Sequence, residues 1–242
     1  MINIVFPVLN EELRLEKGID LVDKYLKEYG MLDYQITIVD NGSTDQTMEI
    51  GKRLCDKYDE VSYLRIEQKG VGVAFKTAVE NNKCDIIGYA DIDLSTELEA
   101  FLKMKNIFEE NQKVEIVNAS RYSNQSTLVG RKWYRNFVSY VLIFILKHTF
   151  RMKSTDAICG FKFFRKKTIE ELLRKSSDEN GWFLLIEVLL RAEHDDKKIV
   201  ELPVKWIYEE HTKVKIFSVT KNYLCQIYKL KKIFKEEAKW KK

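Results

Sequence analysis

The chain has 242 residues, of which 45% are apolar and 32% charged, and its net charge is +4. This length and composition suit one globular domain with a large core, and they exclude a disordered or low-complexity protein. The four cysteines form no C-x-x-C pair and no zinc spacing, so we expect reduced thiols. Because the sequence opens on an apolar strand, we expect no signal peptide and a cytoplasmic location.

Strands and helices are predicted to alternate along the first half of the chain. An apolar strand at Ile2–Phe6 is followed by Glu11, which favours a helix start because carboxylates there meet the positive end of the helix dipole. A second strand at Gln35–Val39 runs into the polar loop Asp40–Asp45, and a second helix is expected after it.

A glycine loop and a pair of aspartates follow. Lys69–Ala74 (KGVGVA) opens a helix predicted around Ala74–Asn81, and Asp85–Ala90 (DIIGYA) reads as a buried strand. Asp91 and Asp93 come directly after that strand, where two carboxylates suggest a hard cation held against phosphates. The alternative is a solvated strand end. Because open parallel sheets bind ligands beyond the carboxyl ends of their strands, we expect a site at this edge.

The second half adds cations and further acids. Arg121 (ASRY) and Arg131 (GRKWYR) carry guanidinium forks that suit phosphate, although an arginine taken alone is more often a surface ion-pair residue. Asp156 lies in TDAICGFK, just before a strand predicted at Phe161–Phe164, and its simpler interpretation is a turn cap. Glu187, in a helix that follows GW, is a weaker candidate site residue.

Two segments bear on membrane association. Phe137–Leu146 is nearly all apolar but shorter than the about 20 residues of a bilayer span, so a buried or an interfacial helix is expected. Residues 215–242 hold nine lysines and two glutamates. Apolar residues recur there at helical spacing: Tyr223, Ile227, Leu230 and Phe234. This pattern predicts a basic amphipathic helix that lies on a membrane, packs on the domain, or does both. A nucleic-acid partner is not expected, because no recognised nucleic-acid motif is present.

The order of these motifs identifies a family resemblance. FPVLNEE, IVDNGSTD, KGVGVAFKTAV, ADIDLS and ASRYS resemble the motifs of family 2 inverting glycosyltransferases of the GT-A fold. The later motifs GRKWYRNFVSY, TDAICGFKFFRK, GWFLLIEVLLRA and VELPVKW, followed by HTKVK, resemble dolichyl- or polyprenyl-phosphate sugar synthases, with the glucosyl branch closer through D-x-x-x-G-F-K. The resemblance covers residues 1 to about 215.

The resemblance implies an α/β fold of the GT-A, Rossmann-like type, with a central, mostly parallel sheet flanked by helices. A glycosyltransferase domain over residues 1–214 and a basic amphipathic helix over residues 215–242 are expected. The implied reaction is metal-dependent, inverting transfer of a hexose, glucose before mannose, from a UDP-glucose or GDP-mannose type donor to a polyprenyl or dolichyl phosphate. Transfer to a sugar hydroxyl of a surface polysaccharide or glycolipid is the alternative, and a non-catalytic nucleotide-sugar-binding protein is the remoter one.

The same resemblance implies ligands and site residues. Mg²⁺ or Mn²⁺ is the expected cofactor, with Asp93 as main metal ligand and Asp91 binding ribose or metal. Ile92 lies between them, where the family more often has alanine, and its side chain is expected to point away. The nucleoside pocket is expected to be lined by Pro7, Leu9, Glu11, Asp40 and Asn41, with asparagine where many relatives have a second aspartate.

The acceptor side is implied in the same way. Arg121, Arg131 and Lys213 would hold the lipid phosphate and the donor diphosphate, and Asp156 matches the aspartate proposed as catalytic base in the family. The expected catalytic residues are therefore Asp156, Asp93 and Arg131. Since a phosphate monoester is already largely ionised at pH 7, Asp156 either removes a proton or orients the acceptor or metal. We also expect a peripheral location at the cytoplasmic face of a membrane.

Overall fold

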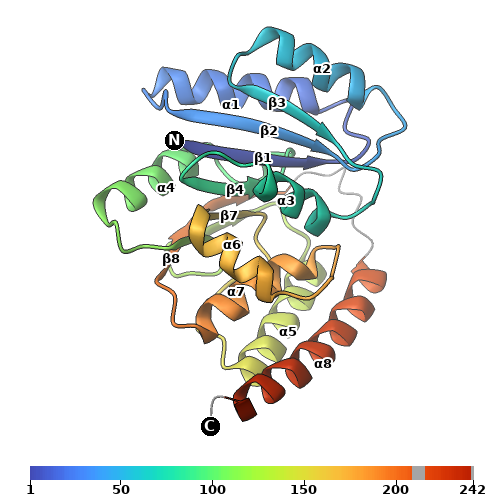
Figure 1. Ribbon diagram of the computed structural model, residues 1–242, viewed down its shortest axis with the longest axis vertical. Helices are drawn as coiled ribbons and strands as arrows, with labels where there is room; N and C mark the ends of the chain where they lie inside the picture. Colours follow the sequence, from blue (N-terminus) through green and yellow to red (C-terminus); the bar gives the residue numbers. More distant parts are fainter. Residues whose placement is uncertain (209–215, 241–242) are drawn as a thin grey trace.

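The computed structural model describes residues 1–208 and 216–240, and side chains within 1–208 and 222–237. A seven-stranded sheet forms its centre, in the order β3-β2-β1-β4-β7-β5-β8 (Figure 1). Its strands are β1 (Ile2–Val8), β2 (Tyr34–Asp40), β3 (Val61–Arg65), β4 (Ile86–Ala90), β5 (Ile116–Ser120), β7 (Phe161–Arg165) and β8 (Ile199–Pro203). A small second sheet pairs β6 (Thr127–Val129) with β9 (Lys205–Ile207).

The main sheet is mostly parallel, which confirms the expected fold class. Only β7 runs antiparallel, and it lies between β4 and β5. The helices are α1 (Leu15–Glu28), α2 (Thr47–Lys57), α3 (Val71–Glu80), α4 (Glu99–Glu110), α5 (Trp133–Phe150), α6 (Lys166–Lys175), α7 (Phe183–His194) and α8 (Ile216–Trp240). α3 begins three residues before the predicted Ala74, because the glycine loop itself supplies the first helical turn.

Side chains alternate between the two faces of the sheet, as the strand period of two requires. One face buries residues such as Phe6 and Phe163 against α1, α2 and α4. The other buries residues such as Val5 and Phe164 against α3, α6 and α7 (Figure 1). Because both faces are covered, the central strands are largely apolar, and runs such as Ile86–Ala90 are fully buried.

A third cluster joins the outer side of α7 to α5 and α8, which run close together in Figure 1. Tyr223, Ile227 and Leu230 of α8 are buried in it, so the apolar stripe of the basic helix packs on the protein. The boundary expected at residues 214/215 falls next to residues 209–215, which lie outside the described part, and the division into two units stays a prediction.

The predicted apolar segment Phe137–Leu146 lies within α5 and is only partly covered. Ile143 and Leu146 are buried, whereas Phe137 and Phe144 are 62% and 61% exposed. Among the helices that the structure describes, none combines the length and apolarity that crossing a bilayer requires.

Candidate functional site

The topology brings the predicted site residues to one edge of the sheet. β4 and β5 are parallel to each other, so Asp91 and Arg121 follow their strands at the same edge. Because β7 is antiparallel, the loop that precedes it ends at this edge as well, and it delivers Asp156. Residues up to 70 positions apart in the chain are thereby adjacent.

Asp91 is packed against the backbone of the loop that carries Asp156. Its amide donates to the Gly160 carbonyl at 3.1 Å. A Cβ on Gly160 would lie 1.7 Å from Asp91 Oδ2, so only glycine leaves room for this carboxylate. Burial, together with the nearby charge of Asp93, raises the pKa of Asp91 to about 8.

Asp93 and Ile92 complete the motif. Asp93 Oδ1 accepts a hydrogen bond from the Ser95 amide at 2.9 Å, and Leu94 between them has a left-handed φ of 51°. Ile92 is buried, and a Cβ on Gly18 of α1 would lie 2.9 Å from its Cδ1, so its side chain points into the core as expected. Among the described side chains, no group of three His, Cys, Asp or Glu is arranged to hold a metal ion.

Asp156 and Arg121 form a buried, bidentate ion pair. Arg121 Nε and Nη2 donate to the two carboxylate oxygens at 2.7 and 3.1 Å, and the Arg121 amide adds a third bond. The amides of Ile158 and Cys159 donate to Asp156 Oδ1. Burial alone would raise the pKa of Asp156, but the charge and hydrogen bonds of Arg121 outweigh it and the pKa is lowered. Asp156 is thus ionised, fully buried and bound by five donors.

Arg131 lies beside this pair, held by neutral partners. It donates to the hydroxyl of Tyr122, to Asn136 Oδ1 at 2.8 Å and to Ser139 Oγ at 3.0 Å. None of the described carboxylates forms an ion pair with it. Burial and the charge of Arg121 lower its pKa. Arg121 is thus paired with a carboxylate, whereas Arg131 has neutral hydrogen-bond partners among the described residues.

Trp206 connects the two arginines, and sequence reasoning did not single it out. Its ring lies 5.7 Å from Arg121 Cζ and 5.5 Å from Arg131 Cζ. Such cation–π contacts orient guanidinium groups without consuming their hydrogen-bond donors. Trp206 is the last residue of the motif VELPVKW, and its place in that motif was the available sequence signal for a role in the site. Lys213, expected to share this role, lies outside the described residues.

Asp40 and Asn41 are buried, and both side chains form hydrogen bonds within the protein. Asp40 is fully buried, and its carboxylate accepts from the Ser43 amide, the Tyr63 hydroxyl and Arg65 at 2.8, 2.6 and 3.1 Å. Asn41 donates to the carbonyl at the end of β1 and accepts from the Gly70 amide. The two side chains therefore fix the ends of β1 and β2 against the glycine loop.

The other nucleoside candidates lie just beyond β1. Pro7 is half-buried, and Leu9 is 38% exposed. Glu11 pairs with Arg14 at 2.8 Å, and its amide donates to Thr47 Oγ1. Their roles toward a nucleotide stay predictions.

The glycine loop has a partner within the protein. A Cβ on Gly70 would lie 2.1 Å from the Asn180 carbonyl oxygen, and that oxygen accepts from the Val73 amide at 3.1 Å. The segment between α6 and α7 thus covers the start of α3, which explains the glycines by contact with the protein's own backbone. Glu187, a weaker candidate for orienting the acceptor, is buried and pairs with Arg191 at 2.8 Å, so its role is internal.

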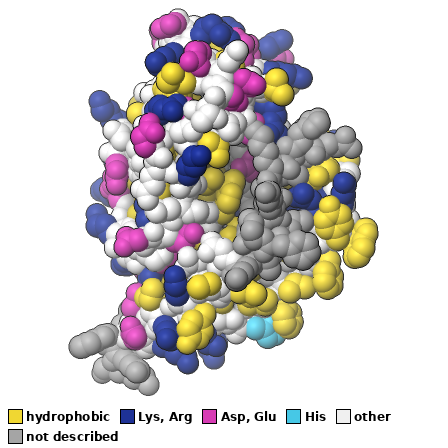
Figure 2. Space-filling model, turned by 90° about the vertical axis from the view of Figure 1, so that its right-hand side faces the viewer, with side chains coloured by type: hydrophobic (Ala, Val, Ile, Leu, Met, Phe, Trp, Pro, Cys, Tyr) yellow, Lys and Arg dark blue, Asp and Glu magenta, His cyan; other side chains and the backbone are white. Residues whose placement is uncertain are grey.

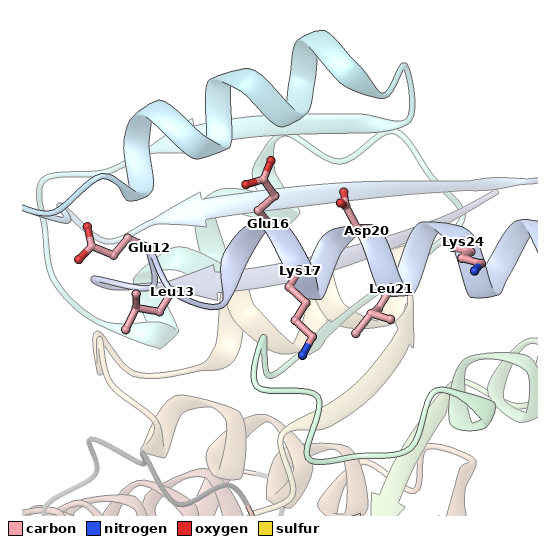
Figure 3. Close-up of a pocket in the computed structure, with 7 residues that line it drawn as sticks. All are labelled: Glu12, Leu13, Glu16, Lys17, Asp20, Leu21 and Lys24. Carbon is pink, nitrogen blue, oxygen red and sulfur yellow. The ribbon is translucent and has the colours of Figure 1, made fainter.

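A shallow hollow of about 410 Å³ lies along α1, away from this cluster (Figure 3). Figure 3 shows its side chains projecting from α1 and from the turn that precedes it, which carries Glu12 and Leu13. Glu16 and Asp20 form ion pairs with Arg53 and Lys57 of α2. The hollow contains none of the predicted site residues.

Comparisons with known proteins identify the family. The sequence model of glycosyl transferase family 2 matches residues 3–173, which is most of the chain. This protein belongs to that family. The match contains both aspartates of the D-x-D motif, Arg121, Arg131 and Asp156.

Several curated relatives are similar over nearly the whole chain. Dolichyl-phosphate beta-glucosyltransferase of Homo sapiens is 25% identical over 88% of this chain and 69% of its own length. The protein of the same name from Dictyostelium discoideum is 27% identical over 95% of this chain and 77% of its own length. Glycosyltransferase AglD of Haloferax volcanii is 25% identical, and the chain spans only 34% of its length.

Solved structures share the fold. Glucosyl-3-phosphoglycerate synthase from Mycobacterium tuberculosis in complex with UDP gives a TM-score of 0.71 at 17% identity, covering 96% of this chain and 80% of that one. Its complex with Mn²⁺, UDP and glucosyl-3-phosphoglycerate gives 0.70 at 15% identity, covering 95% and 79%. At this level of identity the likeness shows a shared fold and nothing more.

Proposed function

We propose that this protein transfers a hexosyl group, glucose before mannose, from a nucleotide-diphosphate sugar to a polyprenyl or dolichyl phosphate with inversion. Family membership and the names of the curated relatives support transfer to a lipid phosphate. The cluster of Arg121, Arg131 and Trp206 supplies a place where phosphate oxygens would be bound.

The burial and hydrogen bonding of Asp156 favour a phosphate acceptor over a sugar hydroxyl. A sugar hydroxyl must lose its proton to an accessible base, and Asp156, the base that the resemblance implies, is buried beneath five hydrogen-bond donors. A phosphate monoester, whose second pKa is near 6, needs no such base at pH 7. In this proposal Asp156 orients Arg121, and Arg121 and Arg131 bind the acceptor phosphate and the donor diphosphate.

A divalent cation fits the D-x-D pair. Asp91 and Asp93 offer hard oxygen ligands one residue apart. Burial, together with the charge of Asp93, raises the pKa of Asp91, so its ionised form would be favoured by a bound cation. The two carboxylates would hold Mg²⁺ or Mn²⁺ together with diphosphate oxygens. When bound, such an ion offsets the charge that develops on the leaving nucleotide diphosphate. The complexes of glucosyl-3-phosphoglycerate synthase with Mn²⁺ and with Mg²⁺ are consistent with this cofactor.

Peripheral membrane contact is proposed through α5 and not through the apolar stripe of α8. Exposed apolar side chains recur along one side of α5 at helical spacing: Trp133, Phe137, Tyr140, Val141 and Phe144. Figure 2 shows hydrophobic side chains gathered at the lower right of the face that it presents. Lys132 and Lys147 flank this α5 face, a pattern typical of helices at anionic lipid surfaces.

The α5 face is continuous with the proposed acceptor site. Arg131 precedes the helix by two residues, and it is anchored by Asn136 and Ser139 of α5. The ring of Tyr140 lies 4.7 Å from that of Tyr122, whose hydroxyl contacts Arg131. A lipid chain leaving a phosphate at Arg131 would therefore meet apolar surface, which a soluble acceptor would not need.

The proposal is tested by incubating the protein with radiolabelled UDP-glucose or GDP-mannose and a short polyprenyl phosphate. The matched control acceptor is the corresponding polyprenol, which differs only in lacking phosphate. We expect label in the organic phase with the phosphate alone, at a rate that falls below pH about 6 as the phosphate becomes protonated. Transfer to polyprenol or to a soluble oligosaccharide at an equal rate would reject the lipid-phosphate assignment.

A further inference from the structure

Four polar side chains form a row across four adjacent strands of the main sheet. Tyr89 of β4 is paired with Lys162 of β7, Lys162 with Asn118 of β5, and Asn118 with Glu201 of β8. Residues directly opposite each other on paired strands present their side chains to the same face. We call these four residues the polar row. A buried sheet face is normally apolar, so the row requires a reason.

Each member of the polar row binds the loop that precedes β7. Glu201 accepts from the Thr155 amide at 2.6 Å, and Asn118 Nδ2 donates to the Asp156 carbonyl at 2.8 Å. Lys162 Nζ donates to the Cys159 carbonyl at 2.6 Å, and the Tyr89 hydroxyl reaches the same oxygen at 3.4 Å. The row therefore holds the loop from Thr155 to Cys159.

That loop joins the two halves of the proposed site. At one end Asp156 binds Arg121, on the acceptor side. At the other end Gly160 lies against the carboxylate of Asp91, on the metal side. A fixed loop therefore keeps Arg121 in a fixed position relative to the D-x-D carboxylates. The hydrogen bonds from the polar row are what fix the loop.

Lys162 is the member whose presence is hardest to explain by packing. Its side chain is fully buried, and none of the described carboxylates lies within ion-pair distance of its Nζ. Burying an ammonium group without a directly paired anion is costly, and a linear apolar side chain would fill the same volume without that cost. At longer range its charge is offset by the ionised carboxylate of Asp156.

We propose that Lys162 is a positioning residue for the transfer reaction, because it holds the Cys159–Gly160 peptide in register with Asp91 and Arg121. This inference rests on the proposed function in assigning Asp91 to the metal and Arg121 to phosphate. It predicts that loss of the ammonium disturbs metal binding and turnover, although the side chain touches neither ligand.

The test compares Lys162→Met with Phe163→Leu. Methionine keeps an unbranched side chain but removes the charge and the bond to Cys159. Phe163 is the next residue on β7 and is fully buried, but it packs on the opposite face against Phe101 and Phe161, so its loss lowers stability without touching the loop. Three quantities are measured for each variant: the melting temperature, kcat at saturating substrates, and Mn²⁺ binding in the presence of UDP by the electron paramagnetic resonance signal of free Mn²⁺.

For Lys162→Met we expect Mn²⁺ binding to weaken about 10- to 100-fold, the usual effect of losing a group that orients a metal ligand. We expect kcat to fall in parallel, with a smaller change in KM for the sugar nucleotide. Phe163→Leu should lower the melting temperature and leave both other quantities near wild type. If Lys162→Met behaves like Phe163→Leu, the lysine is structural only and the inference is overturned.

Two safeguards keep the test decisive. If Lys162→Met does not fold, Tyr89→Phe and Asn118→Ala each remove one bond to the loop, and both should lower Mn²⁺ affinity; unchanged affinity in both overturns the inference. If wild-type protein transfers no sugar to any acceptor, the proposed function fails, but the comparison of Mn²⁺–UDP binding still decides the role of Lys162.

Discussion

Replacing Gly160 by alanine tests whether the close packing of the D-x-D carboxylate is functional. The added Cβ would lie 1.7 Å from Asp91 Oδ2, whereas ordinary contact begins at 3.4 Å. The carboxylate or the loop must therefore retreat by about 1.7 Å. Because a misplacement of about 1 Å can cost roughly 100-fold in rate, we expect kcat to fall by about 100-fold or more. Overpacking of this kind should also lower the free energy of unfolding by about 1–3 kcal/mol.

Gly30→Ala is the matched control. Gly30 has a left-handed φ of 72°, so alanine there is destabilising by about 1–2 kcal/mol, but nothing lies within 4 Å of the added Cβ. Chemical denaturation and steady-state transfer are measured for both variants, together with the Mn²⁺ concentration that gives half-maximal rate. Only Gly160→Ala should raise that concentration. Wild-type turnover and Mn²⁺ response in Gly160→Ala would refute the reasoning.

Four further predictions follow from the site. Asp93→Ala, or excess chelator on the wild type, should remove nearly all transfer, and full activity in either case would exclude the metal role. Arg131→Ala should raise KM for the lipid phosphate more than calorimetric Kd for the nucleotide, and the reverse pattern would reassign it to the donor. Burial and the charge of Asp93 raise the pKa of Asp91 from 3.8 to about 8, so between these pH values the metal-free folded protein holds a proton that the unfolded chain has released. The free energy of unfolding of the metal-free protein should therefore fall as pH rises through this range toward 8. Metal binding displaces that proton, so Mn²⁺ affinity should rise about tenfold per pH unit up to pH 8 and then level, and a flat profile in isothermal titration would contradict this. Phe137→Ser combined with Phe144→Ser should reduce sedimentation with anionic vesicles while leaving transfer to a short soluble acceptor intact, and undiminished sedimentation would place the contact elsewhere.

The sequence was sufficient for the fold and for the sheet edge at which the candidate site residues gather. Runs such as Ile2–Phe6 and Asp85–Ala90 are short, apolar and followed by polar loops, and these local properties determine both the strands and their carboxyl ends. The strand at Phe161–Phe164 was predicted as well, but its direction was not. Nothing local distinguishes a parallel from an antiparallel strand when both faces are buried, and this direction is what delivers Asp156 to the edge.

The hydrogen-bond partners of the polar site residues could not be predicted from the sequence. Asp156 could be singled out as a candidate, but its five donors come from backbone amides and from Arg121, 35 residues away. Whether it acts as a base or as an anchor depends on burial, which no motif encodes. Similarly, the glycines near Gly70 indicated close backbone approach, but the sequence did not show that the backbone of Asn180 makes such an approach.

The tail helix shows a different limit. Helical spacing of Tyr223, Ile227 and Leu230 fits a membrane helix and a docked helix equally well, because both need one apolar side. The decision depends on whether another element of the fold offers a matching surface, and α5 and α7 do. The exposed side of α5 could not be predicted, because the segment is apolar nearly all round and its composition does not show which of its residues are buried.

The insertion of β7 between β4 and β5 also determines when the site can form. β7 pairs with β4 and β5, which both precede it in the sequence. The contact between Tyr89 and Cys159 closes a loop of 70 residues. β8 must then close another of 83 residues to join β5. Such long-range closures are entropically expensive and slow to form. During synthesis on the ribosome, β1 to β4 can pair as soon as they emerge, whereas the edge that unites Asp91, Arg121 and Asp156 must wait for β7. Until then, one side of β4 is an unpaired strand edge, so the nascent chain passes through a stage that is prone to aggregation.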